Sequence, residues 1–473
     1  MGNAESHSSQ GCCRFHYSPE ELAILDSVFD AMSGSSTSEG TKSGKTAKKL
    51  VTLATLKAYV HKAVLGTMTV RLYNGMRSID PIKKSTGLTD TITKKQFVAF
   101  ITYVLRGTAE ERSLIVERMI SHDADGSVKG KQIKEFTEDL IKSVVNLLRH
   151  EKMLRDWTLE KTGDSTLGLM RLTAYLMSEL KAEDAQLSED NLLNVEYGKH
   201  ALEDWVYRVS YIPSFLHLLV TMGFHITKLQ PQGELFSIKH MLPQCIGIKY
   251  TGLVTVMDIP SVIFLHTNLP SELQSQWKLI FSSQTHGESF SRFSGQILHK
   301  GPSILVIKDS DGYIFGGFAS HSWDVKPQFQ GDSKCFLFTL SPQLGIYTST
   351  GYNDHYMYLN HGQQTMPNGL GMGGQHNYFG LWIDGDYGGG HSKAKPRCTT
   401  YNSPQLSAQE NFSIDTLEVW TVGIPPEDPL SKSKGVLDQD PEARTLLEMI
   451  GKTRISDGLR DPGEDEEEEG NAS

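Results

Sequence analysis

The most constraining feature of this 473-residue chain is a series of short apolar runs between Trp277 and Trp420. The runs Ile304–Lys308, Tyr313–Phe318 and Cys335–Leu340 have the length of β-strands, and Gly, Pro, Asn and Asp interrupt them. Strands at this density, joined by hairpin turns, predict a two-sheet β-sandwich with short helices at its rim.

The residues before this region repeat their apolar positions with helical spacing, so we expect an α+β multidomain protein. The expected parts are a flexible arm over residues 1–17, a helical domain over 18–150, a helical linker over 151–232, the sandwich over 233–425, and a C-terminal helix with an acidic tail over 426–473.

Charge and cysteine usage exclude several classes of protein. A net charge of -10, with an uninterrupted acidic run from Glu464 to Glu469, argues against nucleic acid as a partner. The 5 cysteines include no Cys-x-x-Cys pair, so neither a disulfide framework nor a zinc site is expected, and a cytosolic compartment fits. No apolar run reaches the roughly 18 residues of a membrane-spanning helix.

The N-terminus carries a lipidation pattern. Met1-Gly2-Asn3-Ala4-Glu5-Ser6 matches the motif for N-myristoylation of Gly2 once Met1 is removed. One myristoyl chain binds membranes only weakly, so stable attachment needs a second signal. Palmitoylation of Cys12 or Cys13 would supply it, and the alternative is two free thiols in a flexible arm.

The segment Ser121–Gln132 resembles an EF-hand loop, with Gly126 at the sharp turn and Val128 at the apolar position through which two loops pair. Ile92 and Phe100 stand to each other as Val128 and Phe136 do, so we expect an earlier copy that pairs with this loop.

The metal chemistry of this loop is poor. Calcium requires an acidic first ligand and a bidentate Glu at the last position, and these positions hold Ser121 and Gln132. Asp123 and Asp125 are the acidic residues that remain. We expect a structural, calcium-free pair, with weak calcium binding as the alternative.

A solitary amphipathic helix is predicted after the sandwich. Asp440-Pro441 is a helix start, and Leu446, Leu447 and Ile450 form its apolar face. Such a helix either docks on its own protein or enters the groove of a partner.

Three sets of residues contain the residue types of a catalytic or ligand-binding site. His286, Ser289 and Asp309 are the residue types of a catalytic triad, but no second Gly of a nucleophile elbow follows Ser289. The run Gly369–Gly374 is of a type that cradles phosphate, but no Lys-Ser/Thr follows it, so a close backbone crossing or a turn at a sheet edge is preferred. Asp384 to His391 contains potential cation ligands and is interpreted as an exposed glycine-rich loop. We expect no catalytic residues, metal or cofactor.

The central stretch resembles the TLDc domain family over roughly residues 235 to 425. The matching motifs are Trp277-x-Leu-Ile-Phe-Ser-Ser, His286-Gly-x-Ser-Phe290, Gly301-Pro-x-Ile-Leu-Val-Ile-x-Asp309, Phe315-Gly-Gly-Phe-Ala-Ser320, Phe336-Leu-Phe338, Gly371-x-Gly-Gly374, Phe379-Gly-Leu-Trp-Ile383 and Glu418-Val-Trp420.

The resemblance implies a two-sheet sandwich flanked by helices, a link to oxidation resistance and binding to the vacuolar proton pump. The lipidation pattern and trailing helix resemble a myristoylated, mTOR-associated member, which implies attachment to the cytosolic face of lysosomal membranes, with a cytoplasmic pool. The leading hypothesis is a non-enzymatic adaptor that binds the pump and supports mTOR signalling. The alternatives are a redox-protective or peroxide-scavenging protein and a calcium-gated switch. Cys245, Cys335 and Cys398 lie in or beside apolar strands, which favours inert thiols.

Overall fold

The computed structural model describes residues 17–34, 49–79, 90–121, 127–157, 165–181, 193–229, 241–246 and 254–424. Several residues singled out from the sequence lie outside these ranges: Gly2, Cys12, Cys13, Asp123, Asp125, Leu446, Leu447 and Ile450. Within the described ranges, the structure contains no helix that combines the length and apolar character needed to cross a membrane.

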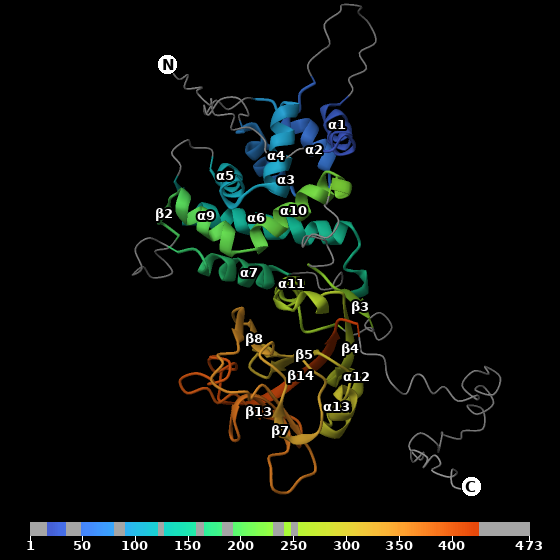
Figure 1. The fold of residues 1–473 in the computed structure, drawn as a ribbon, viewed down its shortest axis with the longest axis vertical. Helices are drawn as coiled ribbons and strands as arrows, with labels where there is room; N and C mark the ends of the chain where they lie inside the picture. Colours follow the sequence, from blue (N-terminus) through green and yellow to red (C-terminus); the bar gives the residue numbers. More distant parts are fainter. Residues whose placement is uncertain are drawn as a thin grey trace, which may run out of the picture. The chain divides into compact units, whose positions relative to one another are not determined.

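The first half of the chain is helical (Figure 1). Its helices are α1 (Pro19–Ser33), α2 (Leu53–Val60), α3 (Gly66–Arg77), α4 (Lys94–Arg106), α5 (Ala109–Ile120), α6 (Gly130–His150), α7 (Thr166–Ser178), α9 (Lys199–Arg208) and α10 (Tyr211–Gly223). Side-chain caps explain several of the starts. Ser18, Thr93 and Thr108 each begin a capping box, in which the side chain of the residue three positions later hydrogen-bonds back to the cap residue.

Within the described residues, two short antiparallel bridges join these helices into helix–loop–helix pairs. Val51 and Ile92 exchange backbone hydrogen bonds of 3.0 and 2.8 Å. Strand β1 (Val128–Lys129) pairs with β2 (Glu196–Tyr197), with Val128 opposite Tyr197. The prediction that the loops of Ile92 and Val128 pair with each other is therefore wrong. Ile92 pairs instead with Val51, and Val128 with Tyr197. Residues 165–208 contribute α7, β2 and α9 to the second pair.

Helix α10 packs against both pairs, through α4 of the first and α6 of the second. Its residues are apolar on all sides and almost all are buried, as expected of a helix without a solvent-facing side. At its end, Phe224 lies 5.9 Å from Phe97 and 6.4 Å from Tyr59, measured between ring centroids. The chain thus fills the space between the two pairs with its own helix.

The second half of the chain is the β-sandwich. Its strands are β3 (Gln244–Ile246), β4 (Gln276–Ser282), β5 (Ser303–Asp309), β6 (Ile314–Ala319), β7 (Lys326–Gln330), β8 (Phe336–Ser341), β9 (Gly345–Thr348), β10 (Met357–Asn360), β11 (Gly369–Gln375), β12 (Tyr378–Asp384), β13 (Gly389–His391) and β14 (Asn411–Val422). The sandwich half also contains the short helices α11 (Ile259–Asn268), α12 (Ser283–His286) and α13 (Phe290–Ile297).

In the described chain the strands form a single hydrogen-bonded system of 12 strands rather than two separate sheets. The path runs β7-β10-β11-β12-β13-β14-β5-β6-β8-β9, and β4 pairs with both β14 and β3. The long strand β14 causes this continuity, because it pairs with β13 over 411–413 and with β5 over 414–421. One strand therefore belongs to both layers of the sandwich.

The two layers bury a common apolar interior. Leu305 and Ile307 of β5 share this core with Leu370 of β11 and Leu381 of β12. The alternate residues of β5 face the other way and join a core that extends through α11 into the helical half. Since successive strand residues point to opposite faces, β5 is apolar on both sides and lies between two cores.

Candidate functional site

The three residue types of a catalytic triad each form other hydrogen bonds in the structure. The Nδ1 atom of His286 accepts a 3.0 Å hydrogen bond from the backbone of Ser282, and Ser289 caps α13. The carboxylate of Asp309 is 1% exposed and accepts a 2.6 Å hydrogen bond from the hydroxyl of Ser407. These side chains stabilise turns and helix starts and do not form a nucleophile–base pair.

The glycine-rich run is strand β11, which pairs with β10 on one side and β12 on the other. Its paired backbone is not arranged to cradle a phosphate. A Cβ on Gly371 would lie 2.6 Å from the ring of Phe379, so glycine is required by the aromatic rings packed over it. The sequence placed this close approach at a sheet edge, whereas β11 is an interior strand.

The loop with potential cation ligands is also structural. Trp382 donates a 2.8 Å hydrogen bond from Nε1 to Oδ1 of Asp384, and residues Gly389–His391 form β13 instead of an exposed loop. Among the described residues, no group of three or more His, Cys, Asp or Glu side chains could hold a metal ion.

The described thiols are buried. Among the described residues, Cys245, Cys335 and Cys398 form no disulfide, and all three are buried. Burial raises the pKa of Cys335 and of Cys398, because a thiolate loses its hydration inside the protein. Since the thiolate is the reactive form, these side chains are poorly suited to reduce peroxide.

The two ends of the EF-hand-like loop are occupied by helix contacts. Ser121 is 6% exposed and follows the last residue of α5, with its backbone N–H bonded to Glu117. The side-chain oxygen of Gln132 accepts a 2.9 Å hydrogen bond from the backbone of Lys129 and so caps α6. Neither residue supplies the negative charge that calcium requires at these two positions.

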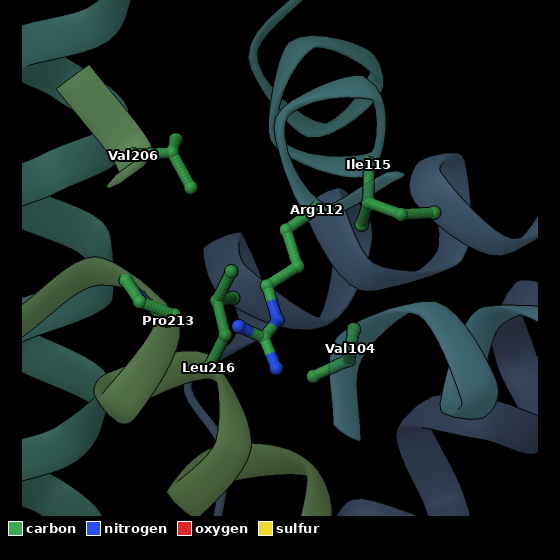
Figure 2. Close-up of a pocket in the computed structure, with 6 residues that line it drawn as sticks. All are labelled: Val104, Arg112, Ile115, Val206, Pro213 and Leu216. Atoms are coloured by element: carbon green, nitrogen blue, oxygen red, sulfur yellow. The ribbon is translucent and has the colours of Figure 1, made fainter. Parts of the chain in front are cut away.

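A small recess lies between the two helix–loop–helix pairs, and the side chain of Arg112 extends into it (Figure 2). Its walls are aliphatic and come from α4, α5, α9 and α10: Val104, Ile115, Val206, Pro213 and Leu216. Burial and the nearby Arg112 lower the pKa of His217 to about 4, so His217 is neutral at physiological pH. The recess is part of the packing between the pairs.

An aromatic cluster spans the strands at the β7 end of the sheet. The ring of Phe329 stacks with those of His355 and His376, at centroid distances of 4.1 and 5.3 Å. Phe379 and Trp382 continue the cluster, stacked at 4.5 Å. The sequence did not reveal this cluster, because its rings come from separate strands and loops. Phe379 and Trp382 are buried and Phe329 is partly buried, so the cluster is a small aromatic core on this side of the sheet.

Glu418 joins the start of the sandwich to β14. Its carboxylate is 0% exposed and accepts hydrogen bonds from Thr255 Oγ1 at 2.6 Å, Val256 N at 3.0 Å and Trp420 Nε1 at 3.1 Å. Burial raises the pKa of Glu418, and these neutral donors oppose the shift. The carboxylate is fully enclosed, so it holds two segments together and is not open to a substrate.

Comparison with known proteins agrees with this architecture. The family model of the TLDc domain matches residues 254–423. The chain is 55% identical to mTOR-associated protein MEAK7 of Gallus gallus over 99% of this chain and 100% of that protein, and 45% identical to the Homo sapiens protein of that name over 98% and 100%. Nuclear receptor coactivator 7 of Mus musculus is 35% identical over 33% of this chain and 16% of its own length. The chain therefore belongs to the family of mTOR-associated MEAK7 proteins and carries their TLDc domain.

Proposed function

We propose that this protein is a non-enzymatic, membrane-anchored adaptor that binds the vacuolar proton pump and supports mTOR signalling at lysosomes. The observation that carries the proposal is similarity over the full length to relatives whose name states an association with mTOR. Full-length similarity matters because it includes the N-terminal arm and the C-terminal region as well as the sandwich.

The chemistry of the described residues supports binding over catalysis. His286, Ser289 and Asp309 are each used in local structure. The buried thiols Cys335 and Cys398 have raised pKa values, the opposite of what a peroxide-reducing cysteine needs. No observation favours the redox-protective alternative, and the neutral ends of the EF-hand-like loop weigh against a calcium-gated switch.

Membrane attachment is assigned to the N-terminal arm. A myristoyl group on Gly2 would provide marginal affinity for the lysosomal surface, and a palmitoyl group on Cys12 or Cys13 would make attachment stable. Partner binding is assigned to the TLDc sandwich and to the apolar face of Leu446, Leu447 and Ile450.

The proposal is tested by comparing the full chain, Gly2→Ala and a truncation after Pro426 in cells. Gly2→Ala should leave lysosomal membranes for the cytoplasm but still recover the pump and mTOR after detergent extraction. The truncation should stay on membranes and recover less of both partners. Equal membrane attachment and equal recovery by all three proteins would contradict this division of roles.

A further inference from the structure

The two ends of the strand path are protected differently against pairing with other chains. At one end, β7 carries Lys326 and Pro327, and its register with β10 shifts between Met357 and Leu359. A charged residue, a proline and an irregular register are the devices that keep an edge strand from accepting another strand. The β7 edge is therefore protected against pairing with a strand of another chain.

The opposite end, β9, has none of these devices. Its sequence is Gly345-Ile346-Tyr347-Thr348, without charge or proline, and it pairs with β8 in an unbroken antiparallel register. Backbone groups in an antiparallel strand point alternately to either side, so half of those in β9 point away from β8. Within the described chain, β9 makes no backbone hydrogen bond outside this pair.

The side chains of β9 present one apolar residue on each face of the sheet at this edge. Ile346 packs against the core shared with the helices, and Tyr347 packs against the sandwich interior. Both remain half-buried. The Tyr347 hydroxyl lies 3.3 Å from Oγ1 of Thr339, which holds the ring in place. A strand added beside β9 would cover one apolar side chain on each face.

We propose that β9 is a docking edge for an extended, uncharged segment of a partner protein, with apolar residues at two adjacent positions, one directed to each face. The backbone of that segment bonds to the outward groups of β9, and its side chains pack beside Ile346 and Tyr347. A second copy of this chain is a poorer occupant. Edge pairing over a strand of 4 residues buries far less than the roughly 1,200–2,000 Å² of a stable interface.

The test uses the full-length chain and a displayed library of random peptides of strand length. Ile346→Pro and Tyr347→Pro each remove one backbone N–H, and alternation places one of these groups outward. Proline is tolerated in a strand only where the replaced N–H faces solvent. The one of these two variants that keeps the wild-type melting temperature is therefore the variant that lacks an outward-facing N–H. Gln328→Pro, at an exposed position of β7, is the matched control.

Selected peptides should bind about tenfold or more weakly to the well-folded β9 variant and unchanged to Gln328→Pro. They should also protect the outward amides of Gly345–Thr348 from hydrogen exchange. Failure to select any binder would overturn the proposal, as would equal binding to all variants or protection elsewhere. Dimerisation of the free chain that the β9 variant abolishes would also overturn it, because a second copy would then occupy the edge.

Discussion

The indole ring of Trp157 stacks on that of Trp420, with ring centroids 5.3 Å apart and planes inclined by 29°. Trp157 ends a short 3-10 helix, Arg155–Trp157, in the helical half, whereas Trp420 lies in β14. Trp277 of β4 meets Trp157 edge-on at 5.7 Å, and Trp157 donates from Nε1 to the carbonyl of Pro243 at 3.0 Å. The helices and the sandwich therefore meet through a buried aromatic contact.

Trp157→Ala should lower the free energy of unfolding by about 3–5 kcal/mol, because it leaves a cavity and removes the partner of the Pro243 carbonyl. Urea unfolding measures the change. Tyr207→Ala is the control, since Tyr207 is 75% exposed and its loss should change the stability by about 0.5 kcal/mol or less. Equal effects of the two substitutions would contradict the packing described for Trp157.

Glu418→Gln should change how stability depends on pH. Burial raises the pKa of Glu418 above its usual 4.5, so the folded chain holds this proton more tightly than the unfolded chain. The resulting stabilisation is complete below pH 4.5 and is lost as pH rises through the folded-state pKa. Glutamine does not ionise, so the variant should gain stability relative to the wild type over that range.

Urea unfolding of both proteins across this pH range measures the difference. Glu288→Gln, at an exposed position, makes the same change in charge and serves as the control. A stability difference between Glu418→Gln and the wild type that does not vary with pH would show that ionisation of Glu418 does not contribute.

Gly316→Ala and Gly295→Ala should have effects of opposite sign. A Cβ on Gly316 would lie 1.8 Å from the backbone oxygen of Leu305, so β5 and β6 would have to separate, at a cost of about 1–3 kcal/mol or more. Gly295 lies in α13 with nothing within 4 Å, and alanine there should add about 0.5–1 kcal/mol through helix propensity. Melting temperatures of the two variants measure both stability changes. Stabilisation by Gly316→Ala would contradict the close approach of β5 and β6.

In a Cys12→Ser, Cys13→Ser background, the remaining thiols should react with Ellman's reagent only after unfolding. Burial raises the pKa of Cys335 and Cys398, which keeps these groups protonated and shielded. Absorbance is followed in native buffer and in urea. Rapid reaction of the native protein, together with catalytic consumption of peroxide that Cys-to-Ser changes abolish, would instead support the redox-protective alternative.

Ser121→Asp combined with Gln132→Glu should bind calcium, whereas we expect the wild type not to. The two changes supply an acidic first ligand and a bidentate last ligand. Glutamate should still cap α6, because it accepts the hydrogen bond from Lys129 N that Gln132 accepts. Isothermal titration calorimetry with calcium compares the two proteins. Tight binding by the wild type would contradict a structural role for the loop.

Local patterns in the sequence were sufficient for several strands of the sandwich. The run Ile304–Lys308 is contained in β5, Tyr313–Phe318 overlaps β6, and Cys335–Leu340 overlaps β8. These predictions succeeded because strand length, apolar content and turn residues are properties of neighbouring residues. Helix starts are local in the same way, since the capping box at Ser18 involves residues three positions apart.

The sequence did not reveal which distant segments meet. Ile92 and Val128 were correctly recognised as bridge positions, but their partners, Val51 and Tyr197, follow from packing. The same holds for the aromatic cluster around Phe329.

The amino-acid sequence alone was therefore enough for the TLDc motifs, the strands and the absence of a convincing triad pattern, because all of these depend on residue type and short spacing. Only the tertiary structure decided that Asp309 bonds to Ser407, that Glu418 is enclosed and that Trp157 stacks on Trp420. Contacts between residues far apart in the chain form because the whole core is buried together, and no local pattern records them.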